Sequence, residues 1–269
     1  MIRDSAMSTT KQNYPFRLGC TSYVIPDDII PNVKRIGPLV DDVELVLFES
    51  PDHSNIPSEQ DIDILAQLAT NQDITYTVHL PIDRKAGARS VDERIGFVKA
   101  AQKIIHRTRA LNPYGYVLHF EGIRFDSPTE DVLFWRNAIQ EVCVHLVSSL
   151  EVDSQRICVE NLGYPTEWHL ELVHRFDFSF CFDIGHLWLY GVENWMDIVQ
   201  ACLQRTRIIH LHGVERGKDH LSLTRGPREN IIQLIDKFLP LYNGVVTLEV
   251  FTEQDTLSSL QMVKELWER

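Results

Sequence analysis

The sequence has no long apolar segment, and it carries little positive charge for its length. No run approaches the roughly 18 consecutive apolar residues of a membrane-spanning helix, and the polar segment 1–14 lacks the apolar core of a secretory signal. We therefore predict a cytoplasmic protein that does not enter membranes, with a disordered tail at 1–14. The net charge of −12 at pH 7 repels a phosphate backbone, so no nucleic-acid partner is expected.

Two common sequence signatures are also missing. The five cysteines form no C-x-x-C pair, and Cys158 and Cys181 fall inside apolar runs, which favours reduced, buried thiols over disulfides or a redox site. No Gly-x-Gly-x-x-Gly segment follows an early apolar run, which disfavours a dinucleotide-binding fold.

What the sequence does contain is an alternation of apolar runs and amphipathic segments. The predicted strands are 16–20, 43–48, 74–80, 116–120, 156–160, 178–183, 207–211 and 245–250, each followed by a helical pattern. Such alternation predicts parallel β/α units. A chain of 269 residues fits one such barrel, which typically has about 250 residues. The predicted fold is a single (β/α)8 TIM barrel over 15–269, with its active site at the C-terminal ends of the strands.

Six of the apolar runs end in a residue that can bind a divalent cation. These residues are His79, His119, Glu160, Asp183, His210 and Glu249. In a (β/α)8 barrel the C-terminal strand ends carry the chemistry. Three imidazoles and three carboxylates at one mouth would make a nitrogen and oxygen site for Zn²⁺ or Mn²⁺.

Further histidines follow two of these strand ends. His186 comes three residues after Asp183, with Gly185 between them to permit a sharp turn. An alternative role for Asp183 is to cap the helix that follows it. His212 lies on the same strand face as His210 and is expected to orient a ligand or the substrate. His220 is expected on a loop at the same end of the barrel.

The loops after the third and seventh predicted strands are basic although the protein is acidic. Arg84 lies in the first loop, and Arg216 and Lys218 lie in the second. Arginine side chains can hold a phosphate with two hydrogen bonds. We therefore expect Arg84, His212, Arg216 and Lys218 to contact the substrate.

The order and spacing of these residues resemble the xylose isomerase-like barrel superfamily. The match is carried by His119, Glu160-Asn161, Asp183-x-x-His186, His210-Leu211, His220 and Glu249. For the sugar isomerases and epimerases of that group, the resemblance implies one divalent ion held by Glu160, Asp183, His210 and Glu249.

For the endonuclease IV branch the resemblance implies three zinc ions. His79, His119, His186 and His220 would then be additional metal ligands. That branch has an aspartate two residues before the last histidine, where this chain has Lys218, so one ligand of the three-metal pattern is missing. The number of bound ions is left open between one and three.

Four segments resemble more closely the cobamide-remodelling phosphodiesterases of the same superfamily. These segments are 18–26, 41–49, 211–214 and 248–251. The resemblance implies metal-dependent hydrolysis of the nucleotide loop of B12-type corrinoids to cobinamide phosphate and an α-riboside. Glu160 or Glu249 would act as general base. The alternatives are a sugar isomerase or epimerase that uses one divalent ion, and a corrinoid carrier without catalysis.

Overall fold

The chain folds into a closed barrel of eight parallel strands, in the order β1-β10-β7-β6-β5-β4-β3-β2. The computed structural model describes residues 11–50 and 52–269. The barrel strands are β1 (Arg17–Thr21), β2 (Asp42–Val46), β3 (Thr75–His79), β4 (Tyr116–His119), β5 (Ile157–Glu160), β6 (Ser179–Asp183), β7 (Thr206–Leu211) and β10 (Val245–Leu248). The predicted (β/α)8 barrel is confirmed.

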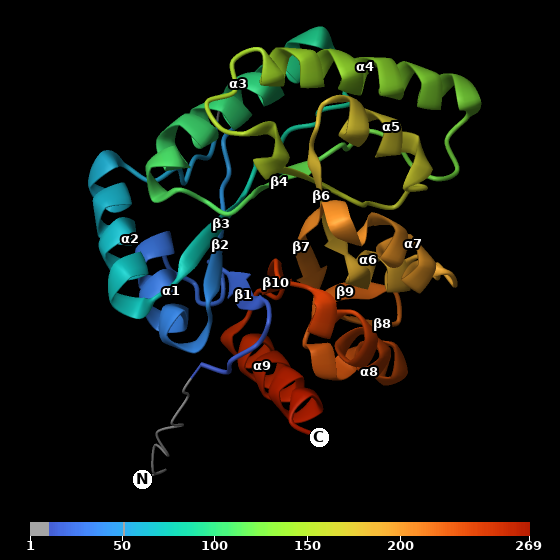
Figure 1. Ribbon diagram of the computed structural model, residues 1–269. Helices are drawn as coiled ribbons and strands as arrows, with labels where there is room; N and C mark the ends of the chain where they lie inside the picture. The colour runs from blue at the N-terminus through green and yellow to red at the C-terminus, as the bar shows by residue number, and fades with distance from the viewer. Residues whose placement is uncertain (1–10, 51) are drawn as a thin grey trace.

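The helices form a ring outside these strands (Figure 1). They are α1 (Ile29–Ile36), α2 (Glu59–Gln72), α3 (Val91–Thr108), α4 (Thr129–Val147), α5 (Glu167–Arg175), α6 (Ile184–Leu189), α7 (Trp195–Cys202), α8 (Arg228–Lys237) and α9 (Glu253–Trp267). The short helix α6 begins directly at the end of β6 with no intervening loop, and Asp183 is its N-cap residue. Among the residues that the structure describes, no helix combines the length and apolar character needed to cross a membrane.

The seventh strand is followed by an antiparallel hairpin, β8 (Gly213–Glu215) and β9 (Lys218–Leu221). His220 was predicted on a loop; it lies instead on β9, with a positive φ of 51°. Arg216, in the turn of the hairpin, also has a positive φ, 54°. This backbone conformation is uncommon for residues other than glycine, and it sets the direction of the side chains on this hairpin.

Alternation along the strands separates an outer core from the lumen of the barrel. Outward residues such as Tyr76 meet the helices; its hydroxyl donates to the carbonyl of Leu65 on α2 at 2.8 Å. In the lumen, a small apolar cluster of Val117, Cys158, Cys181 and Ile208 is buried. All five cysteines are free, and four of them are buried. The lumen is therefore filled with side chains, and the polar strand ends lie at one end of the barrel.

The N-terminal segment is partly described. Residues 1–10 of the predicted disordered tail lie outside the described residues. The Lys11 ammonium donates to the carbonyls of Gln72 and Asp73, and Tyr14 stacks on Phe16 with ring centroids 4.9 Å apart. For residues 11–14 these contacts differ from the disorder that the sequence predicts.

Candidate metal centre

Strand register brings the predicted ligands together in pairs. His119 on β4 is the Cα partner of Glu160 on β5, and Asp183 on β6 is the Cα partner of His210 on β7. Glu249 follows β10 directly, and its N–H donates to the carbonyl of Leu211 at 3.1 Å. Glu160, Asp183, His210 and Glu249 are all buried and offer ligand atoms within 4.8 Å of one another.

A second group of donors shares Glu160 with the first. His79 Nε2 lies 3.6 Å from Glu160 Oε2, and His119 Nε2 lies 2.9 Å from the same oxygen. The two imidazoles meet edge to face with centroids 4.7 Å apart. These three residues also place ligand atoms within 4.8 Å of one another.

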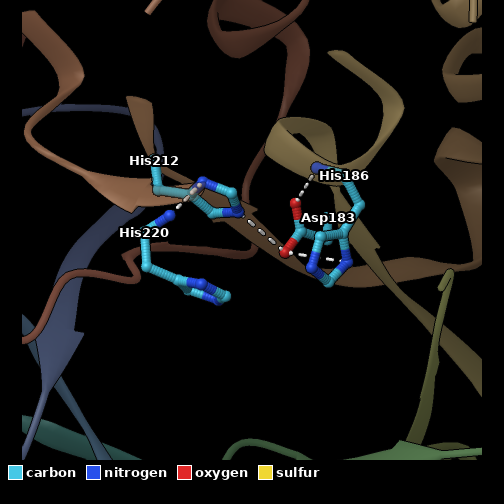
Figure 2. A group of neighbouring side chains, drawn as sticks. All are labelled: Asp183, His186, His212 and His220. Atoms are coloured by element: carbon cyan, nitrogen blue, oxygen red, sulfur yellow. Dashed lines mark hydrogen bonds and ion pairs between the residues drawn. The ribbon is translucent and has the colours of Figure 1, made fainter. Parts of the chain in front are cut away.

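A third group is built around Asp183, and Figure 2 shows it. Asp183 Oδ1 accepts from the N–H of His186 at 2.6 Å and so caps α6. His212 Nε2 lies 3.2 Å from Asp183 Oδ2. The N–H of His220 donates to His212 Nδ1 at 3.1 Å, and these two imidazoles stack with centroids 4.5 Å apart. Asp183 thus has the predicted capping role and also lies among the candidate ligands.

Carboxylates are shared among these groups. Glu160 belongs to the first and second groups and to a further group with Cys181 and His210, and Asp183 belongs to the first and third. Both side chains are almost fully inaccessible to solvent. A buried carboxylate requires a cation or hydrogen-bond donors to offset the loss of hydration. The arrangement is a shared cluster of imidazole and carboxylate donors.

The histidines of the cluster have a ring nitrogen close to a partner outside it, and His79, His119, His186 and His210 are examples. His79 Nδ1 lies 2.8 Å from the carbonyl of Leu80, and His186 Nδ1 lies 3.1 Å from that of Asn161. Carboxylates hold the other two, Glu121 at His119 Nδ1 (3.4 Å) and Glu44 at His210 Nε2 (3.0 Å). Metal-binding histidines usually have such an outer partner, which fixes the ring and its tautomer.

Glu44 and Glu121 were not singled out in the sequence. A signal was present for Glu44, because it is a charged residue inside the apolar run of β2, where it is fully buried. Glu121 follows His119 by two residues at the end of β4, which places it near the same mouth. Neither residue belongs to the predicted ligand set.

The charges of the cluster shift the pKa values of its members. Burial lowers the pKa of His119, but the charge of Glu160 and hydrogen bonds to Glu121 and Glu160 outweigh it and raise the pKa to about 10. Burial raises the pKa of Glu160 and of Glu249, yet the neighbouring histidines hold both pKa values well below the ordinary range. Both glutamates are therefore ionised at neutral pH.

Two buried atoms of the cluster lack any hydrogen-bond partner. They are His210 Nδ1 and Glu249 Oε2, which lie 3.1 Å apart without forming a hydrogen bond. A ring nitrogen and a carboxylate oxygen left in this way are poorly stabilised unless a cation lies between them. Imidazole and carboxylate donors suit Zn²⁺ or Mn²⁺. The donor set therefore fits a divalent cation.

The predicted substrate-binding residues are more dispersed. His212 lies within the cluster, as described above. Arg84 Nε donates to the carbonyl of Glu49 at 2.6 Å, and none of the interactions described for Arg84 involves a residue of the cluster. Arg216 and Lys218 are exposed on the β8–β9 hairpin. Whether Arg84, Arg216 and Lys218 bind substrate stays a prediction.

Comparison with known proteins identifies the family to which the fold belongs. The family model of the xylose isomerase-like TIM barrel matches residues 30–266, and the chain belongs to this family. No curated protein sequence matches the chain.

Solved structures with the same fold have low sequence identity to the chain. A D-tagatose 3-epimerase-like protein is 22% identical, with a TM-score of 0.78 over 94% of this chain and 97% of that one. Endonuclease IV from Thermus thermophilus is 16% identical, with a TM-score of 0.74 over 94% and 99%. D-psicose 3-epimerase from Clostridium cellulolyticum is also 16% identical, with a TM-score of 0.67 over 94% and 98%. At these identities the likeness concerns the fold alone.

Proposed function

We propose that this protein is a metal-dependent phosphodiesterase that hydrolyses the nucleotide loop of cobamides to cobinamide phosphate and an α-riboside. The observation that carries the proposal is the sharing of Glu160 and Asp183 among three donor groups. A site for one ion needs only Glu160, Asp183, His210 and Glu249. The additional histidines extend the site to two or three ions, and paired cations favour in-line displacement at phosphorus.

The side chains of the cluster support this chemistry. Bound divalent cations supply Lewis acidity at a phosphoryl oxygen and lower the pKa of water. Glu249 is the more accessible of the two candidate bases, at 6% exposed against 1% for Glu160. We therefore propose that Glu249 is the general base that accepts the proton of the attacking water. His220 Nε2, 3.4 Å from Glu249 Oε2, orients that carboxylate. Arg216 and Lys218 on the hairpin would steady the phosphate.

Aromatic side chains around the mouth of the barrel are consistent with the proposal of a large substrate with a flat apolar body. Tyr23, Phe125, Tyr190 and Phe251 are exposed on the segments that follow β1, β4, β6 and β10. Phe251 lies 5.3 Å from the His220 ring, and Tyr190 lies 6.3 Å from the His186 ring, measured between centroids. Exposed aromatic surface of this kind suits a corrin ring. The cobamide assignment itself depends on the resemblance of the four sequence segments.

The proposal is tested by incubating the protein with adenosylcobalamin after loading with Zn²⁺ or Mn²⁺. Chromatography with mass detection should find cobinamide phosphate and an α-riboside, and the E160Q variant should form neither. A duplex with one abasic site serves as a competing substrate, and its cleavage in place of the cobamide would assign the activity to DNA repair. Absence of both products with every divalent ion would exclude the phosphodiesterase proposal.

Sugar epimerisation is the second candidate, and the complete four-residue group favours it. Glu160 and Glu249 both lie close to His210, with Oε2 atoms 3.5 and 3.1 Å from its Nδ1. Two carboxylates on opposite sides of a bound ketose could remove and return a proton at the carbon next to the carbonyl. The similar folds of the D-tagatose 3-epimerase-like protein and D-psicose 3-epimerase agree with this candidate. Uptake of solvent deuterium into a ketohexose during turnover would establish it.

A further inference from the structure

The carboxylate of Glu44 reaches across the barrel lumen to His210. Glu44 lies on β2 and His210 on β7, and the closed order places β1 and β10 between these strands. Glu44 Oε2 nevertheless lies 3.0 Å from His210 Nε2, and both side chains are fully buried. The contact therefore joins two non-adjacent strands through the interior, underneath the donor groups at the mouth.

The two nitrogens of His210 have opposite surroundings. Nε2 faces Glu44, whereas Nδ1 lies 3.1 Å from Glu249 Oε2 and 3.5 Å from Glu160 Oε2. Nδ1 makes no hydrogen bond to either carboxylate. Neutral imidazole carries one ring proton. If this proton lies on Nε2 and is donated to Glu44, the lone pair of Nδ1 points at the space between Glu160 and Glu249.

We propose that Glu44 is a positioning residue that fixes the tautomer of His210, so that Nδ1 is presented to the cation held by Glu160, Asp183 and Glu249. This inference rests on the metal centre of the proposed function. Glu44 itself is not assigned as a ligand, because its contact is with the nitrogen on the far side of the His210 ring. An outer carboxylate of this kind also strengthens imidazole as a donor.

The stability of the fold does not explain why a carboxylate is buried at position 44. Its second oxygen, Oε1, is buried without a hydrogen-bond partner, and a buried carboxylate with an unpartnered oxygen destabilises the folded state. Asp42 on the same strand provides the comparison. It is equally buried, but Thr75 and Thr77 donate to its two oxygens at 2.7 and 2.8 Å, and no described contact joins it to the donor groups.

The test compares E44Q and E44L with D42N as the matched control. Titration calorimetry of metal-free protein with Zn²⁺ and with Mn²⁺ gives the affinity. We expect E44Q, which keeps an acceptor oxygen, to bind about 10-fold more weakly and E44L up to about 100-fold more weakly, the range known for outer-shell partners. D42N should stay within about 3-fold of the parent protein, since Asp42 has no contact with the donor groups.

The tautomer is measured separately by ¹⁵N NMR of the histidine rings in the Zn²⁺-loaded protein. The expected result is a protonated Nε2 and an unprotonated Nδ1 at His210, with a change of this pattern in E44L. A proton on Nδ1 in the parent protein, or equal metal affinities for the parent, E44Q and E44L, would overturn the inference while leaving the metal centre intact. A parent protein that takes up neither ion would overturn the proposed function and this inference together.

Discussion

His119 and Glu160 lie on adjacent strands with Nε2 and Oε2 2.9 Å apart, at the point where three donor groups converge. The same Glu160 oxygen is 3.6 Å from His79 Nε2. One carboxylate therefore serves as the common neighbour of two imidazoles that belong to different strands. The consequences of removing its charge should extend across the cluster.

Replacing Glu160 by glutamine should abolish turnover and remove most of the bound metal. The variant keeps the shape of the side chain but places an amide where the cations require an anionic donor. We expect metal affinity to fall by more than about 100-fold, beyond the range of outer-shell substitutions. Elemental analysis after dialysis against a fixed concentration of Zn²⁺ measures the effect. The matched control is E141Q, which removes an exposed carboxylate paired with Arg94; metal loss in both variants would contradict the assignment.

Asp183 and His220 should differ in importance. D183N retains an oxygen that can cap α6, but it loses a charge that two donor groups share, so metal content and turnover should both collapse. H220A removes a partly exposed side chain at the rim of the third group and should give only a partial loss of rate. Bound metal, melting temperature and turnover of the two variants are compared side by side. Full metal content and full turnover in D183N would show that the site is placed wrongly.

Gly185 should be required for the position of His212. A Cβ atom at residue 185 would overlap the His212 imidazole, which is in contact with Asp183 and His220. We expect G185A to destabilise the fold by about 1–3 kcal/mol, the usual cost of overpacking, and to weaken metal binding. G191A is the control, because Gly191 has a φ of 65° but no atom within 4 Å of an added Cβ. Its cost should be backbone strain alone, with metal binding unchanged.

The strand ends were predictable because parallel strands of a barrel present their C-terminal residues at one mouth. That rule alone placed His79, His119, Glu160, Asp183 and His210 near one another, and the register pairs His119 with Glu160 and Asp183 with His210. The contact of Glu44 with His210 was not predictable, since it joins positions 166 residues apart through the lumen. The hairpin after β7 was missed for a different reason. Its two-residue turn has positive φ at Arg216 and Gly217. Gly217 is a typical residue for such a turn, but Arg216 is not, and the flanking strands are too short to give a clear alternating pattern.

His169 should make the protein sensitive to acid. It lies on α5, is fully buried, and neither ring nitrogen has a hydrogen-bond partner. Burial lowers its pKa from 6.5 to about 3. Between these values the unfolded chain binds a proton that the folded chain excludes, so the free energy of unfolding falls as pH decreases from about 6.5. Each unit of pKa difference is worth about 1.4 kcal/mol.

The measurement is urea unfolding of metal-free protein between pH 4 and 8, for the parent and H169F. Phenylalanine suits the site because Phe120, Tyr164 and Phe180 surround the ring. H169F should be more stable than the parent at pH 7, since two unpartnered nitrogens are removed, and the difference should grow as the pH falls. A constant difference across the pH range would show that His169 titrates normally and is not buried as described.

The final prediction concerns Asp219, which lies beside the third donor group. The resemblance to the three-metal branch implies an aspartate at position 218, where this chain has lysine. On the β8–β9 hairpin, however, Asp219 Oδ1 lies 3.2 Å from His220 Nδ1, and Asp219 Oδ2 lies 3.9 Å from His186 Nε2. Lys218 is exposed. The adjacent residue can therefore supply the carboxylate that the sequence comparison found missing.

We expect D219N to retain the ions held through Glu160 but to lose the one held near His186 and His220, so that zinc content falls by about one ion per chain. K218A should keep the full zinc content, because its ammonium has no described contact with the donor groups. The comparison uses elemental analysis of each protein after equilibration at several fixed concentrations of free Zn²⁺. If D219N binds as much zinc as K218A at every concentration, Asp219 is not a ligand. A parallel loss in both variants would indicate that the hairpin as a whole, rather than the Asp219 carboxylate, supports the third group.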